Sequence, residues 1–87
     1  MNYQQDSIGQ ILLEARKRES KTQTDIANKL KIAPVYVCNI EKNYHIPSIE
    51  LGAGIAEILR LDVREFLFLI LRKKYPKLAH IFKSETE

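Results

Sequence analysis

Residues 23–41 read QTDIANKLKIAPVYVCNIE and predict two short amphipathic helices joined by a tight turn. Ile26 and Leu30 fall on one side of the first helix. Val37 and Ile40 fall on one side of the second helix, which leaves its other side exposed. Two helices in this arrangement can present the second one to the major groove of DNA, which is wide enough to admit it.

Capping residues around this stretch mark the ends of further helices. Three pairs have the spacing of a capping box, in which each side chain satisfies a backbone N–H of the first turn. These pairs are Ser7–Gln10, Thr22–Asp25 and Asp62–Glu65. We expect five helices, which run from Ser7 to about Arg18, from Thr22, from Pro34, from Ile49 to Arg60 and from Asp62 to about Lys74. Pro76 either ends the last helix or starts a short turn through Phe82.

The composition fits a single small domain. The 87 residues are 45% hydrophobic, which is enough for a modest core, and the sequence shows no strand pattern or repeat. The formal net charge of +3 suits a polyanionic partner. Cys38 is the only cysteine and the longest apolar run is too short to span a bilayer. We therefore expect a cytoplasmic protein without a membrane partner.

Residues at consistent spacing along the chain form a pattern that no single position would establish. They are Ile8-Gly9, Arg16, Gln23, Ile26-Ala27, Lys29, Ile32, Val37, Ile40-Glu41, Pro47-Ser48, Ile55-Ala56, Leu59 and Phe66-Leu67. This pattern resembles the lambda-repressor-like helix-turn-helix family, of the Cro and repressor (XRE) type. The resemblance implies an all-α bundle of five helices with a C-terminal helical extension. We take residues 1–67 as the DNA-binding domain and residues 68–87 as the extension.

The resemblance implies that the helix starting at Pro34 reads double-stranded DNA in the major groove. Positions that match the family's base contacts are Ala33, Pro34, Val35, Tyr36 and Asn39. Asn39 can offer a paired donor and acceptor to adenine, and Val35 can meet a thymine methyl group. Tyr36 can contact either a base edge or a phosphate.

Gln23 matches a phosphate contact of the family at the start of a helix. Unpaired N–H groups and partial positive charge favour an anion at such a position. Neighbouring candidates for phosphate contacts are Lys21, Thr22, Lys42, Asn43 and Tyr44, with Lys17 and Arg18 as further ones. Ordinary solvation is the alternative for each lysine, because phosphate contacts do not require one particular residue.

Arg16 and Glu41 resemble the ion pair that ties the first helix of the family to the end of the recognition helix. We expect both residues to be structural. Lys31 departs from the pattern, because glycine in a left-handed conformation is usual at this turn. Gly52 and Gly54 also depart from it, and they either allow close packing of the fourth helix or weaken it.

Residues 66–71 are six successive apolar residues, more than one side of a helix can bury. We expect Phe66, Leu67 and Ile70 to pack inward. The residues expected to face outward, at a homodimer interface, are Phe68, Leu69 and Leu71. The alternative is that the tail after Pro76 folds back over them within one chain.

The sequence gives no support to catalytic or metal chemistry. Cys38, His45 and His80 lack the spacing of metal ligands, and no nucleophile motif or phosphate-binding glycine loop is present. We expect no enzymatic activity, no cofactor and no metal. The expected function is a sequence-specific transcriptional regulator, a homodimeric repressor on a palindromic operator. The alternative is an antitoxin-like or other protein-interaction module of the same fold, whose apolar C-terminal segment holds a protein partner.

Overall fold

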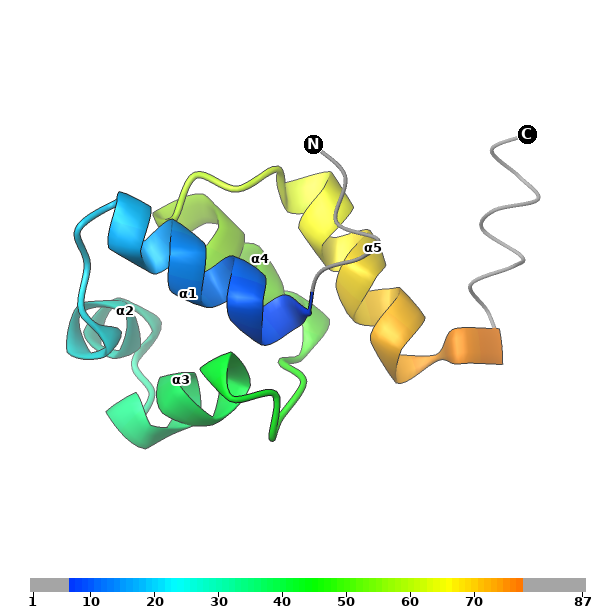
Figure 1. The fold of residues 1–87 in the computed structure, drawn as a ribbon, viewed down its shortest axis with the longest axis horizontal. Helices are drawn as coiled ribbons and strands as arrows, with labels where there is room; N and C mark the ends of the chain where they lie inside the picture. The colour runs from blue at the N-terminus through cyan, green and yellow to red at the C-terminus, as the bar shows by residue number, and fades with distance from the viewer. Residues whose placement is uncertain (1–6, 78–87) are drawn as a thin grey trace.

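Five helices follow one another in the computed structural model, which describes residues 7–77 (Figure 1). They are α1 (Ile8–Arg18), α2 (Gln23–Leu30), α3 (Pro34–Glu41), α4 (Ile49–Ile58) and α5 (Val63–Lys74). Pro76 and Lys77 begin a further helical turn, and the rest of the turn expected through Phe82 lies outside the described residues. None of the described helices has the length and apolarity needed to cross a membrane. The all-α fold predicted from the sequence is confirmed.

The capping box of α2 is complete. Thr22 Oγ1 accepts a hydrogen bond from the Asp25 N–H at 2.9 Å, and the Asp25 carboxylate accepts one from the Thr22 N–H at 2.8 Å. The bonds from the Thr22 N–H and hydroxyl hold the pKa of Asp25 below its ordinary value, because they favour the charged carboxylate. This box fixes the position at which α2 begins.

The other two predicted boxes are only half formed. Ser7 and Asp62 each accept a hydrogen bond from the N–H three residues on, at 3.0 Å. The Gln10 amide nitrogen donates to Glu14 at 2.7 Å, and Glu65 Oε2 is buried without a hydrogen bond. One side-chain bond is therefore enough to start α1 and α5 at their predicted residues.

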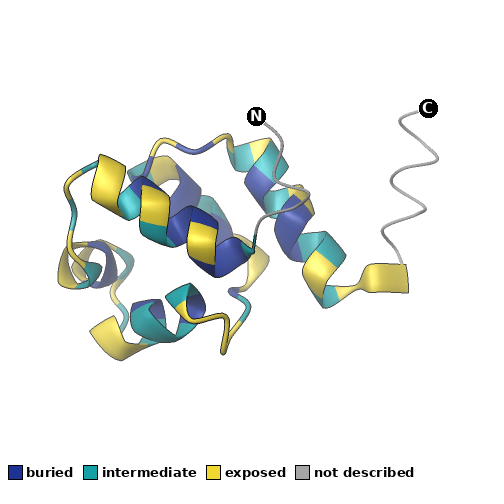
Figure 2. Ribbon diagram, viewed as in Figure 1, coloured by how far each residue is buried: buried dark blue, intermediate teal, exposed yellow. Residues whose placement is uncertain are grey.

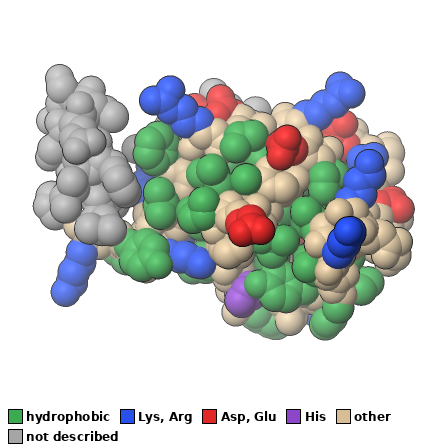
Figure 3. Space-filling view, turned by 180° about the vertical axis from the view of Figure 1, so that it is seen from behind, with side chains coloured by type: hydrophobic (Ala, Val, Ile, Leu, Met, Phe, Trp, Pro, Cys, Tyr) green, Lys and Arg blue, Asp and Glu red, His purple; other side chains and the backbone are tan. Residues whose placement is uncertain are grey.

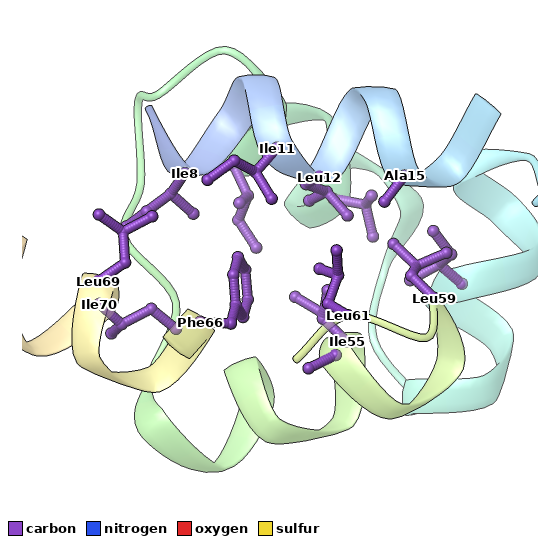
Figure 4. Packing of buried hydrophobic residues seen from close by; sticks show 14 of the residues in the cluster. Ile8, Ile11, Leu12, Ala15, Ile55, Leu59, Leu61, Phe66, Leu69 and Ile70 are labelled. Atoms are coloured by element: carbon purple, nitrogen blue, oxygen red, sulfur yellow. The ribbon is translucent and has the colours of Figure 1, made fainter. Parts of the chain in front are cut away.

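The core lies where α1, α4 and α5 meet. Figure 4 shows the ring of Phe66 inserted from α5 between the side chains of α1 and α4. Each helix turns one side inward, so buried and exposed residues recur along it with helical periodicity (Figure 2). Ile26 of α2 and Val37 and Ile40 of α3 are also completely buried. Their burial fixes how α2 and α3 sit against the rest of the domain.

Glycines allow close approach between helices. A side chain at Gly9 of α1 would lie 2.7 Å from the Ile40 carbonyl oxygen and would also overlap the Glu41 carbonyl oxygen. Within α4, a Cβ at Gly52 would overlap Ile70, and one at Gly54 would lie 2.7 Å from a methyl group of Leu30. Of the two alternatives for the α4 glycines, the structure therefore supports close packing.

The helices end without glycine. Ser20, Lys31, Asn43 and Arg60 all have positive φ angles, between 55° and 62°. Lys31 adopts the left-handed conformation predicted for this turn, with φ 59° and ψ 44°. At the end of α4, Arg60 reverses the chain and the Leu61 N–H donates to the Ala56 carbonyl at 2.9 Å. The helix consequently stops at Ile58, and the predicted end at Arg60 is wrong.

Replacing Lys31 with glycine should increase the free energy of unfolding by about 1 kcal/mol, because glycine adopts this conformation without the steric cost of a Cβ. Chemical denaturation of both proteins measures the difference. A variant less stable than the original chain would contradict the assignment of strain to this residue.

The apolar run in α5 is buried differently from the prediction. Leu69 is only 1% exposed, so the expectation that it faces outward is wrong. Phe66, Leu69 and Ile70 share one side of the helix at the spacing i, i+3, i+4, and all three are buried. Leu67 and Leu71 are half-buried and Phe68 is 38% exposed. Because α5 is continuous across residues 67 and 68, the core of the domain extends beyond residue 67.

Candidate nucleic-acid interface

The turn between α2 and α3 fixes the angle between the two helices. The Ile32 N–H donates to the Ala27 carbonyl at 3.0 Å, immediately after the left-handed Lys31. Pro34 occupies the first turn of α3, where its fixed φ suits the helix and its missing N–H costs nothing. No side chain caps α3, because Ala33 stands at the N-cap. The start of α3 is therefore left clear, with Ala33, Pro34 and Val35 all exposed.

The outer side of α3 and its C-cap residue carry a line of side chains, which we call the α3 stripe: Val35, Asn39 and Lys42. They lie at the spacing i, i+4, i+7, opposite the buried Val37 and Ile40. Val35 is 63% exposed, Lys42 is exposed and Asn39 is half-buried. Figure 1 shows α3 along one edge of the molecule, with α2 beside it. The exposed residues at both ends of this stripe, Val35 and Lys42, leave this side of the helix open to approach from outside.

Tyr36 lies at one edge of the α3 stripe. Its hydroxyl forms a hydrogen bond with Nε2 of His45, in the loop that follows α3. The two rings meet edge to face, with centroids 4.6 Å apart. The sequence suggested no role for His45 beyond a metal ligand, which its spacing did not support. The pairing of His45 with Tyr36 was not predicted. No periodicity links residues nine positions apart across a helix end, so the sequence carried no signal for this contact.

Arg16, Glu41 and Gln23 form a network behind α3. Arg16 Nε donates to Glu41 Oε2 at 2.6 Å, and Arg16 Nη2 donates to Glu41 Oε1 at 3.2 Å. The Gln23 amide donates to the same Oε1 at 2.9 Å, and Arg16 Nη1 donates to the Lys21 carbonyl at 3.0 Å. The Glu41 side chain is only 6% exposed. Arg16 and Glu41 thus form the ion pair that the resemblance implies, and it ties α1 and α2 to the end of α3.

Several predicted phosphate contacts have structural partners. The side chain of Asn43 accepts from the Gly9 N–H at 3.0 Å and donates to the Ser7 hydroxyl at 3.2 Å. The Thr22 hydroxyl and N–H are both used in the capping box. Asn43 and Thr22 therefore hold helix ends, and their contacts with phosphate stay predictions. The side-chain amide of Gln23 also donates one hydrogen bond to Glu41.

Other predicted phosphate contacts lie at the start of α2 and just after the end of α3. The N–H groups of Gln23 and Thr24 are in the first turn of α2, where no intrahelical acceptor exists. Tyr44 is exposed, and the Lys42 ammonium lies 6.0 Å from the centre of its ring. Lys21 is half-buried next to the start of α2. Lys42 and Tyr44 sit at one end of α3, and the start of α2 and Lys21 lie beside it.

A comparison with protein families identifies the chain. A family model described as helix-turn-helix matches residues 12–66, well over half of the chain. The chain belongs to the helix-turn-helix family. The match runs from α1 into α5 and includes the whole of α2, the turn and α3. The searches of curated proteins and of solved structures gave no significant match.

This helix-turn-helix domain is of the lambda-repressor-like type, as the sequence predicted, and that family consists of DNA-binding regulators. The α2–turn–α3 unit lies wholly within the matched residues, and in helix-turn-helix proteins the second helix of this unit is the one that enters the major groove. Residues 7–77 contain no cluster of three or more His, Cys, Asp or Glu side chains that could hold a metal ion. The chemistry that this surface offers is hydrogen bonding, apolar contact and positive charge.

Proposed function

We propose that this protein is a sequence-specific DNA-binding transcriptional regulator without catalytic activity. The observation that carries the proposal is the α3 stripe. Val35, Asn39 and the C-cap residue Lys42 lie on the side of α3 opposite the buried Val37 and Ile40, in a chain of the helix-turn-helix family. The width of the major groove admits such a helix, and a protein can distinguish base pairs there by hydrogen bonds and methyl contacts.

The proposed base contacts come from the exposed start and outer side of α3. Asn39 supplies a donor and an acceptor, while Val35 and Ala33 supply apolar contact for thymine methyl groups, with Pro34 beside them. The proposed phosphate contacts come from the N–H groups of Gln23 and Thr24 and from the side chains of Lys21, Lys42 and Tyr44.

Replacing Asn39 with alanine should weaken binding to the selected site by about 1–3 kcal/mol and barely change binding to random DNA, because only the base contact is lost. Fluorescence anisotropy with both duplexes measures the two affinities. Lys42→Ala is the matched control on the same stripe and should weaken binding to both duplexes alike. An equal loss of affinity on both duplexes for Asn39→Ala would refute base reading by Asn39.

We also propose a homodimeric repressor that binds a palindromic operator. Apolar exposure on α5 supports this, since Phe68 is 38% exposed and Leu67 and Leu71 are half-buried. Figure 3 shows hydrophobic side chains gathered on the face opposite to that of Figure 1. Two copies would place two recognition helices about one DNA turn apart. Sedimentation equilibrium should give a dimer, and a monomer that binds a single half-site would contradict this part of the proposal.

A further inference from the structure

The hydrogen bond between Tyr36 and His45 bears on how α3 reads DNA. Tyr36 is on the recognition helix, next to the α3 stripe, and its ring packs against the core. His45 is exposed in the following loop and holds the far end of the tyrosine side chain. The ring contact and the hydrogen bond together restrict both torsions of Tyr36. The position of its hydroxyl is thus set before DNA arrives.

The chemistry of the pair determines which atom is left for a ligand. A tyrosine hydroxyl has one hydrogen to donate and lone pairs that accept, while neutral imidazole has one nitrogen of each kind. A phenol is the stronger donor of the two groups and an imidazole nitrogen the stronger acceptor. The favoured arrangement therefore has the Tyr36 hydroxyl donating to Nε2 of His45, with the imidazole proton on Nδ1. The Tyr36 oxygen can then only accept from a further partner.

An oxygen that only accepts does not bind phosphate, because phosphate oxygens are acceptors as well. In the major groove the donors are the amino groups of adenine and cytosine, while guanine offers two acceptors and thymine offers an acceptor and a methyl group. Tyr36 in this state would favour adenine or cytosine at the position it meets. The sequence left Tyr36 open between a base and a phosphate, and this chemistry favours the base.

We propose that His45 is a positioning residue that turns Tyr36 into a hydrogen-bond acceptor and thereby makes Tyr36 select a base with an amino group at one position of each half-site. The inference rests on the proposed function, since it requires that α3 enters the major groove. It goes beyond that function because it assigns a base class to one residue and a role to His45, which itself contacts no base.

Selection of bound sites from a random duplex pool tests the inference. The original chain should enrich adenine or cytosine, by about tenfold over the other bases, at one position of the site. The Tyr36→Phe and His45→Ala variants should both lose this preference. The double variant should lose no more at that position than either single variant, because both changes remove the same contact. Tyr75→Phe is the matched control, because it removes a tyrosine hydroxyl from an exposed site at the end of α5. This variant should keep the preference for adenine or cytosine.

Different failures of this experiment have different meanings. Enrichment of guanine or thymine at the affected position, or losses that add in the double variant, would overturn the role of His45 and leave the proposed function intact. Enrichment of no sequence by the original chain would overturn both. A second measurement needs no DNA: nitrogen NMR shifts of the His45 ring should show Nε2 without a proton. A proton on Nε2 would overturn the inference.

Discussion

Replacing Gly9 with alanine is expected to lower the free energy of unfolding by about 3 kcal/mol. The added methyl group would lie 2.7 Å from the Ile40 carbonyl oxygen and would overlap that of Glu41. These atoms belong to the backbone at the end of α3, so they cannot turn away as a side chain can. Separating α1 from α3 would also strain the bond between the Gly9 N–H and Asn43. Chemical denaturation measures the loss.

Gly54→Ala is the matched control for this prediction. It is the same substitution inside another helix, but the added methyl group would meet only the end of the Leu30 side chain, which can rotate. Alanine also favours a helix interior over glycine by about 1 kcal/mol. We expect a change in stability within about 1 kcal/mol of zero. If Gly9→Ala were as stable as Gly54→Ala, the tight contact between α1 and α3 would be absent in solution.

Replacing Glu41 with alanine is expected to cost about 3 kcal/mol of folding free energy. The change leaves the Arg16 guanidinium and the Gln23 amide without their shared acceptor in a poorly exposed site. The Arg16 side chain is 15% exposed, so water compensates only part of the lost interaction. Thermal or chemical unfolding measures the cost.

A double variant separates the free energy that the ion pair contributes to folding from the cost of leaving one charge unpaired. Arg16→Met with Glu41→Leu removes both charges and retains apolar volume. Replacement of a buried ion pair by apolar residues is often neutral or stabilising. We expect the double variant to be more stable than Glu41→Ala alone. Equal stability of Glu41→Ala and the original chain would show that the network contributes nothing to the fold.

The fold was predictable because its helix starts are encoded locally. Thr22, Pro34, Ser48 and Asp62 each act within one turn of their own position, so neighbouring residues suffice to place a helix start. The left-handed conformation of Lys31 was predictable only from the resemblance to the family, because lysine itself does not favour it. Which residues of α3 face outward followed from the burial of Val37 and the helical period.

What could not be predicted depends on contacts between distant residues. Every residue from 66 to 71 is apolar, so the pattern could not choose between Leu67 and Leu69 as the buried one. Packing against α1 and α4 makes that choice, and Leu69 is buried. Asn43 was predicted as a candidate phosphate contact, and its structural role at the start of α1 was not predicted. Its partner Gly9 lies 34 positions away, where a local pattern cannot indicate it.

The central claim is that the outer side of α3 enters a DNA duplex. Backbone NMR spectra recorded during titration with a duplex selected from a random pool test it most directly. We predict the largest shifts at Val35, Asn39 and Lys42 and at the start of α2, with binding that weakens steeply as salt is raised because phosphate contacts release counterions. Shifts confined to α5, or no retained duplex even at low ionic strength, would contradict the claim.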